Sequence, residues 1–196
     1  MAMLFHSEIS RIAVETAISK YGKLNGLVLN HGVLTPLGKI SDVKPEEFLD
    51  CLNINTVSHL NPIQKSLEYL RESKGNIVFV SSGAAIGSYA AWGAYNSSKA
   101  AMNSICKTLA NEEPDITSIA VRPGVVDTDM QVQIRQIGGT HMLPNDYEKF
   151  YNLFTNNKLV KADKPAKVLA ELVVNKKHQY NGQFLSFDSE ELKDLQ

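Results

Sequence analysis

A short apolar run that ends in two serines constrains the fold of this chain more than any other stretch. Residues Asn76-Ile-Val-Phe-Val-Ser-Ser82 predict a buried strand, because branched and aromatic side chains follow one another without a polar break. The two serines then stand where the strand meets the edge of its sheet. We therefore expect an α/β fold in which this strand end carries a hydroxyl group into a site.

A tyrosine and a lysine lie four residues apart in the next run, which should be helical from about 93 to 112. Positions i and i+4 share one face of a helix, so Tyr95 and Lys99 should lie side by side. An ammonium beside a phenol favours the phenolate, and this brings proton exchange nearer to neutrality than a tyrosine pKa of about 10 allows. Such a pair suits protonation of a carbonyl oxygen, and Ser82 can aim its hydroxyl at the same oxygen.

The remaining segments predict further strands and helices around this pair. We expect strands at about 24–29, 116–121 and 182–187, and helices at about 7–21, 45–73 and 165–174. Pro62 predicts a kink in the helix that it interrupts. The apolar segment 129–160 is either a lid over a lipophilic substrate or a cover for the sheet. Trp92 and Tyr89 either line a substrate pocket or simply pack.

Together these residues resemble the short-chain dehydrogenase/reductases, whose catalytic signature is a serine followed by Tyr-x-x-x-Lys at this spacing. A turn at Asn30 and a Pro-Gly turn at Pro123 add to the likeness, which covers roughly 8–188. Within the family, the stretches 75–101 and 121–135 look most like the fungal benzil reductase and sepiapterin reductase branch. The resemblance implies a Rossmann-like, doubly wound, mostly parallel sheet of about four strands.

The resemblance also implies an activity, namely hydride transfer between NADP(H) and a ketone or diketone carbonyl of a lipophilic or aromatic substrate. Tyr95 would be the acid/base, and Lys99 would lower its pKa and hold the nicotinamide ribose. Ser82 would bond the reacting oxygen, while Asn53 would maintain a water relay, its alternative being a polar helix-surface residue. His31 is interpreted as a loop histidine rather than a proton donor. The implied cofactor-binding residues are Asn30, Gly32, Tyr95, Lys99, Pro123, Gly124, Val126 and Thr128.

The Gly-x-x-x-Gly-x-Gly turn, which in the family binds the cofactor pyrophosphate at a helix N-terminus, does not occur among the twelve glycines. We therefore expect an N-terminally truncated Rossmann-like fold that lacks its first strands and this turn. The strand at 24–29 would then form an exposed apolar edge. A catalytically inactive remnant or an interaction module is the alternative function. A serine acyl-enzyme is disfavoured because no Gly-x-Ser-x-Gly occurs.

Composition and charge indicate how many domains the chain forms and which partners it could bind. A chain of 196 residues, 43% of them hydrophobic, predicts one soluble domain over 1–196. A net charge of −1 without a basic run argues against a nucleic-acid partner, and no apolar stretch is long enough to span a membrane.

The cysteines and histidines bear on compartment and metal binding. Cys51 and Cys106 are not close in sequence, which fits reduced thiols in the cytoplasm. The histidines show no ligand spacing, so we expect no metal. Small residues on the helix at 93–112 would suit a homodimer.

Overall fold

The chain alternates strands and helices, as the α/β prediction requires. The computed structural model describes residues 2–175 and 177–196. The helices are α1 (Ala2–Tyr21), α2 (Pro45–Asn55), α3 (Leu60–Ser73), α4 (Gly93–Glu112), α5 (Asp129–His141), α6 (Pro144–Thr155) and α7 (Asp163–Val174). The strands are β1 (Gly26–Leu29), β2 (Asn76–Val80), β3 (Thr117–Arg122) and β4 (Phe184–Ser186). The short 3₁₀ helices are η1 (Val57–His59), η2 (Gly83–Ala85), η3 (His178–Tyr180) and η4 (Glu190–Leu195).

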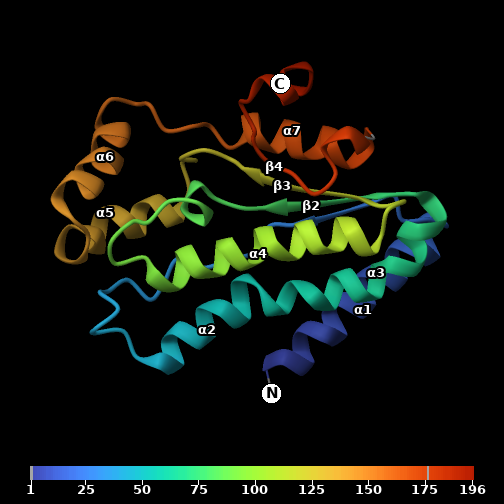
Figure 1. The fold of residues 1–196 in the computed structure, drawn as a ribbon, viewed down its shortest axis with the longest axis horizontal. Helices are drawn as coiled ribbons and strands as arrows, with labels where there is room; N and C mark the ends of the chain where they lie inside the picture. The colour runs from blue at the N-terminus through green and yellow to red at the C-terminus, as the bar shows by residue number, and fades with distance from the viewer. Residues whose placement is uncertain (1, 176) are drawn as a thin grey trace.

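The four strands form one parallel sheet in the order β1-β2-β3-β4, which confirms the Rossmann-like fold class. Val28 of β1 lies opposite Val78 of β2, and Val78 lies opposite Ile119 of β3. Every residue of β2 is buried, as its unbroken apolar run predicts. All strands point the same way, towards α5 and α6 (Figure 1). Ligands of open α/β sheets bind beyond the carboxyl ends of the strands, so this edge is where a site is expected.

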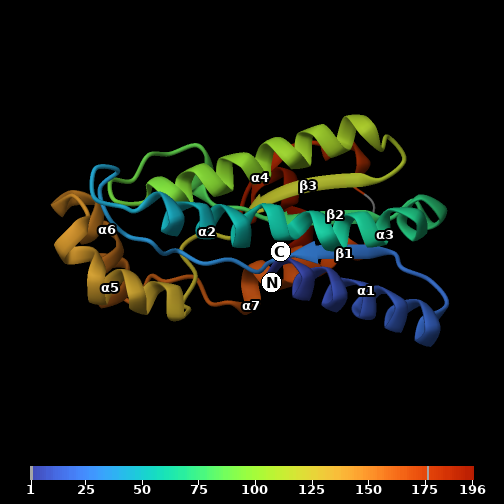
Figure 2. The same cartoon turned by 90° about the horizontal axis from the view of Figure 1, so that it is seen from below.

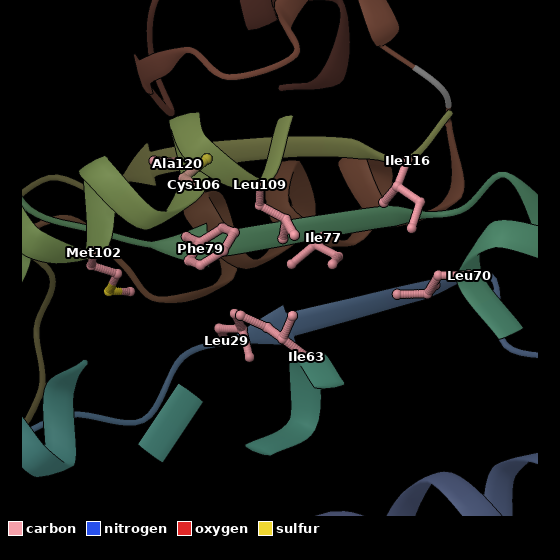
Figure 3. Close-up of a cluster of buried hydrophobic side chains, with 10 residues drawn as sticks. All are labelled: Leu29, Ile63, Leu70, Ile77, Phe79, Met102, Cys106, Leu109, Ile116 and Ala120. Atoms are coloured by element: carbon pink, nitrogen blue, oxygen red, sulfur yellow. The ribbon is translucent and has the colours of Figure 1, made fainter. Parts of the chain in front are cut away.

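Helices cover both faces of the sheet. In Figures 1 and 2, α4, α3 and α1 lie on one face, and α7 lies on the other. The core between the sheet and the helices α3 and α4 is shown in Figure 3. Its buried members are Leu29, Ile63, Leu70, Ile77, Phe79, Met102, Cys106, Leu109, Ile116 and Ala120. This layer fixes α4 against β2 and β3, and therefore fixes the helix that carries Tyr95 and Lys99.

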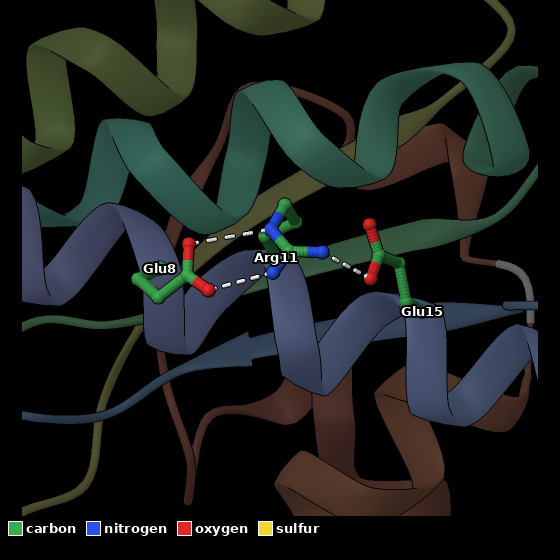
Figure 4. Close-up of polar contacts among 3 residues, drawn as sticks. All are labelled: Glu8, Arg11 and Glu15. Carbon is green, nitrogen blue, oxygen red and sulfur yellow. Dashed lines mark hydrogen bonds and ion pairs between the residues drawn. The ribbon is translucent and has the colours of Figure 1, made fainter.

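The first helix ends at a glycine and carries an exposed ion-pair cluster. Gly22 has a φ of 72° and donates its N–H to the carbonyl of Ile18, which is the left-handed helix ending that its sequence predicts. On the outer face, Arg11 donates to Glu8 at 2.6 Å and to Glu15 at 2.5 Å (Figure 4). All three side chains are solvent-exposed, so these pairs contribute little to stability.

The predicted long helix at 45–73 is interrupted earlier than Pro62. Helix α2 stops at Asn55, Thr56 has a φ of −133°, and α3 begins only at Leu60 after the 3₁₀ turn η1. Pro62 lies in the first turn of α3, where a missing backbone N–H costs no hydrogen bond. The expected kink at Pro62 was therefore wrong, and the break falls at Thr56–His59 instead.

Strand β1 lies at one border of the sheet and pairs only with β2 within 2–175 and 177–196. Val28 is 41% exposed there, whereas Leu29 is buried in the core. The exposed apolar edge expected at 24–29 is thus confirmed at Val28 and wrong at Leu29, because that side chain turns towards α3. Among the helices described, none has the length and apolar character needed to cross a membrane.

Candidate active site

The site begins where β2 ends. Ser82 leaves the strand in extended conformation and begins η2, with its Oγ accepting the N–H of Ala84 at 3.2 Å. The hydroxyl of the preceding residue, Ser81, donates a hydrogen bond to Asn103 of α4 at 2.6 Å. This hydrogen bond joins the end of β2 to α4. The Ser82 side chain also interacts with the Tyr95 phenol and lowers the pKa of that group. The serine and the tyrosine are therefore brought together as the spacing predicts.

Helix α4 delivers Tyr95 and Lys99 to the same place. Both are almost fully buried, with 6% and 4% of their surfaces exposed. The Lys99 Nζ donates to the carbonyl oxygen of Val80, the last residue of β2, at 2.7 Å. It lies 5.8 Å from the centroid of the Tyr95 ring. The helical spacing of four residues thus places phenol, ammonium and strand end within one cluster.

Burial dominates the protonation of this pair. It raises the pKa of Tyr95, although Ser82 acts in the opposite direction. It lowers the pKa of Lys99 to about 8, because a charged ammonium is poorly solvated there. The loss of solvent around the phenol outweighs the hydrogen bond with Ser82, and Lys99 is not among the groups that shift this pKa, so its role in lowering the pKa of Tyr95 stays a prediction. Tyr95 is accordingly held as a neutral proton donor.

An asparagine at the end of α2 connects the turn after β1 to α4. The side chain of Asn55 accepts the Val33 N–H at 2.7 Å and donates to the Val33 carbonyl at 2.8 Å. It also donates to the Ser98 hydroxyl at 3.0 Å, which in turn donates to the carbonyl of Tyr95 at 2.8 Å. Asn55 is fully buried, whereas Asn53 is only half-buried and makes none of these contacts. The structure brings Asn55, not Asn53, to the catalytic cluster.

Gly32 closes the cluster on the side of the turn after β1. A β-carbon at this position would lie 3.1 Å from the Asn55 Oδ1 and 3.7 Å from the Lys99 Nζ. The first of these distances is tighter than most side-chain contacts, so a side chain here would force Asn55 to shift, and glycine lets the turn approach both groups. Asn30 and Gly32 both face the cavity described below.

The Pro-Gly turn after β3 forms another part of the cavity wall. Gly124 has a φ of 79°, and a β-carbon there would lie 3.0 Å from the Phe187 ring, so glycine is required. Val126 pairs with Val160 in an isolated bridge, and Thr128 follows as the N-cap of α5. The backbone of this turn is therefore held in one conformation beside the carboxyl ends of the strands.

These groups surround one cavity of about 760 Å³. It is lined by all the site residues predicted from the sequence except Asn53, namely Asn30, Gly32, Ser82, Tyr95, Lys99, Pro123, Gly124, Val126 and Thr128. Towards α6 its wall is aromatic: Trp92 stacks on Phe150 with ring centroids 5.2 Å apart, and Tyr89 lies 4.8 Å from Trp92. Lys149 donates to the Tyr89 hydroxyl at 2.7 Å beside this wall.

Two residues of this site, Asn55 and Phe150, were not predicted from the sequence. Asn55 carries no signal that separates it from Asn53, because both are asparagines in the same helix. Phe150 lies far along the chain from Trp92, and only the apolar content of 129–160 hinted that this segment meets the cavity. Trp92 is buried in the packing and also lines the cavity, as does Phe150 of the segment 129–160, whereas a lid over a substrate stays a prediction.

Comparison with known proteins agrees with this geometry. Residues 6–137 match the family described as short chain dehydrogenase. An oxidoreductase of Schizosaccharomyces pombe, C30D10.05c, is 43% identical over 184 residues, which cover 93% of this chain and 74% of that protein. Benzil reductase ((S)-benzoin forming) IRC24 of Saccharomyces cerevisiae is 40% identical over 195 residues, covering 93% of this chain and 73% of the relative.

A solved structure shows the same fold. The crystal structure of YIR035C, a short chain dehydrogenase/reductase from Saccharomyces cerevisiae, superimposes with a TM-score of 0.93 at 38% identity. The alignment covers 96% of this chain and 75% of the yeast protein. The four-stranded sheet and its helices therefore correspond to about three quarters of that structure.

Proposed function

Because the chain belongs to the short-chain dehydrogenase/reductase family, we propose that it reduces a ketone or diketone carbonyl with NADP(H) as the hydride donor. The observation that carries this proposal is the convergence of Tyr95, Ser82 and Lys99 on one cavity at the carboxyl end of β2. The preference for NADP(H) over NAD(H) is carried over from the benzil reductase and sepiapterin reductase branch.

The residues around the cavity fit the nicotinamide half of such a cofactor. Asn30, Gly32 and Lys99 line the cavity together with the fixed turn at Gly124–Thr128. Gly32 leaves room beside the Lys99 ammonium, which could donate to ribose hydroxyls. Val126 and Thr128 offer backbone groups and a hydroxyl for a carboxamide. When bound, the cofactor supplies the hydride.

In the reduction, Tyr95 gives its phenolic proton to the substrate oxygen, and Ser82 donates a hydrogen bond to the same oxygen. The raised pKa of Tyr95 keeps it protonated before the reaction, which suits a proton donor. The ammonium of Lys99, with a pKa of about 8, is able to return a proton to the phenolate near neutral pH. Asn55 holds Val33 and Ser98 beside this pair and therefore takes the place, and with it the water relay, that the resemblance implied for Asn53.

The aromatic wall favours an aryl substrate. Trp92 and Phe150 stack almost in parallel, with an interplanar angle of 26°, and present apolar ring surface to the cavity. A flat aryl ketone or diketone would gain burial and ring contacts there. Benzil, the compound in the name of the yeast relative, is therefore a suitable first substrate.

An interaction module is the second candidate. It is favoured by the place of β1 at the border of the sheet, where β2 is its one strand partner within residues 2–175 and 177–196. The two functions are separable, because reduction depends on Tyr95 and pairing along β1 does not.

The test is NADPH-dependent reduction of benzil by the chain and by Tyr95→Phe. We expect activity to fall by a factor of about 10² or more in the variant, since the proton donor is lost while the ring packing is kept. Tyr151→Phe, which alters an exposed tyrosine of α6, is the matched control and should leave activity unchanged. NADPH binding should be saturable and should be lost in Lys99→Ala. Equal activity in Tyr95→Phe and the parent chain would refute the assignment.

A further inference from the structure

A lysine lies at the aromatic end of the cavity. Lys149 belongs to α6 and lines the cavity together with its neighbour Phe150. Its ammonium lies 5.0 Å from the centroid of the Tyr89 ring and 5.7 Å from the centroid of the Phe150 ring. It donates a hydrogen bond to the Tyr89 hydroxyl at 2.7 Å. The aromatic wall of the cavity therefore ends in a positive charge.

The contacts of this ammonium leave its charge unbalanced. A protonated lysine has several N–H donors and no acceptor, and the Tyr89 hydroxyl that takes one of them is a neutral group. Within residues 2–175 and 177–196, no carboxylate forms an ion pair with Lys149. The ammonium can therefore donate to a further acceptor. An anionic acceptor would form a stronger hydrogen bond than a neutral one.

The cavity also carries an excess of positive charge. Its charged lining residues, in the part of the chain that the structure describes, are Lys99, Arg122, Lys149 and Asp188. The carboxylate of Asp188 already accepts a hydrogen bond from the hydroxyl of Ser186. A cleft with low-dielectric walls and charges of mainly one sign attracts ligands of the opposite sign. The cavity therefore favours an anion over a neutral molecule of the same shape.

The positions of the two lysines separate a substrate charge from a cofactor charge. Lys99 lies 5.8 Å from the centroid of the Tyr95 ring, at the reacting end of the cavity. From Tyr95, ring contacts lead to Trp92 with centroids 5.7 Å apart, and then to Tyr89 at 4.8 Å. The Tyr89 hydroxyl in turn holds Lys149. An aryl group lying along these rings would therefore have its carbonyl near Tyr95 and its far end near Lys149.

We propose that Lys149 binds an anionic group of the substrate, so that the preferred substrates are aryl ketones or diketones that carry a carboxylate on a ring. This inference rests on the proposed function, because it takes the reacting carbonyl to lie at Tyr95 and Ser82. The carboxylate accepts hydrogen bonds from the Lys149 ammonium, while the ring packs along Trp92 and Phe150. Charge thus holds one end of the substrate, and the catalytic hydroxyls hold the other.

The exposure of Lys149 determines how strong this preference can be. The side chain is solvent-exposed, so salt screens its charge more than it would screen a buried one. A preference that depends on the Lys149 charge must therefore decrease as the ionic strength rises. Packing of an uncharged ring against Trp92 and Phe150 does not decrease in this way, which allows the two contributions to be separated.

The experiment compares the binding of benzil-4-carboxylate with that of benzil-4-carboxamide, which has nearly the same shape without the charge. Binding to the chain without cofactor is followed through the fluorescence of Trp92, the sole tryptophan. The parent chain should bind the carboxylate more tightly by a factor of about 10. Lys149→Met should abolish this preference by weakening the carboxylate complex, and should change amide binding by less than a factor of about 2. A salt concentration of about 1 M should reduce the preference in the parent chain.

Two further variants are matched controls. Lys149→Arg keeps the positive charge and should keep the preference for the carboxylate. Lys158 is an exposed lysine that is not among the described residues lining the cavity, so Lys158→Met should leave the binding of both ligands unchanged. A loss of preference in Lys158→Met equal to that in Lys149→Met would show that only the overall charge of the chain matters, and would overturn the inference.

Because the measurement needs no turnover, it separates this inference from the proposed function. A carboxylate preference that is lost in Lys149→Met supports the inference even in a chain that does not reduce benzil, and that chain would contradict the proposed function alone. Equal affinity of the parent chain for the two ligands overturns the inference, even where benzil is reduced. A preference that survives in Lys149→Met, or an equal weakening of both ligands there, overturns it as well.

Discussion

Replacing His59 with phenylalanine should make the chain less sensitive to acid. In the folded chain burial holds the pKa of His59 near 3, below its ordinary value of 6.5. The unfolded chain therefore binds a proton at His59 over a pH range in which the folded chain does not. Stability from this group is fully present above pH 6.5 and is lost as the pH falls towards 3.

The size of the loss follows from the two pKa values. A pH of about 5 lies about 1.5 units below the pKa of the histidine in the unfolded chain. Each unit of this difference stabilises the unfolded state by about 1.4 kcal/mol, because only the unfolded chain binds the proton. His59 should thus remove about 2 kcal/mol from the free energy of unfolding between about pH 7.5 and about pH 5. No reduction for solvent screening applies, because only 1% of the residue is exposed.

Urea unfolding at these two pH values measures the effect. The parent chain should lose about 2 kcal/mol more on acidification than His59→Phe does. His141→Phe is the control and should behave as the parent, because His141 is exposed. An equal pH dependence in His59→Phe and the parent chain would show that His59 titrates normally, and the reasoning on its burial would fail.

Two further predictions concern the packing around the site. Asn55→Ala should destabilise the chain by about 3 kcal/mol, because it leaves the buried backbone groups that Asn55 now satisfies without a partner, whereas Asn53→Ala should change stability by less than about 0.5 kcal/mol. Urea unfolding of both variants checks this, and similar losses would contradict it. Gly26→Ala would place a β-carbon 2.3 Å from the Val173 Cγ1 and should cost about 1–3 kcal/mol. Thermal unfolding should show that Val173→Ala restores most of this loss, and a double variant no better than Gly26→Ala would refute the steric cause.

Much of the fold could be predicted because its signals act within a few residues. The apolar run before Ser82 was enough to predict β2, and helical periodicity was enough to place Tyr95 beside Lys99. The turn at Gly124 follows from its Pro-Gly pair, since a φ of 79° is strained for other residues. The residues lining the cavity follow from the parallel sheet, which gathers the carboxyl ends of its strands at one edge.

The asparagine and the helix break could not be predicted because they depend on distant partners. Asn53 and Asn55 are the same residue type and point about 200° apart around one helix. The contacts with Val33, 22 residues before Asn55, and with Ser98, 43 residues after it, distinguish the two. Pro62 is compatible both with a kink and with the first turn of a new helix, so the proline alone does not locate the break.

The break between α2 and α3 also determines which changes in chain length this region can accept. Asn55 and His59 lie on either side of it, four residues apart, while Ile63 and Leu70 of α3 are buried against the sheet. Because Val57–His59 is a 3₁₀ turn outside both α-helices, a residue inserted there would shift the start of α3 relative to Asn55. Either Ile63 and Leu70 would leave their places against the sheet, or Asn55 would leave Val33 and Ser98. An insertion or deletion within 56–58 should therefore disturb the core or the site, whereas a substitution there acts locally.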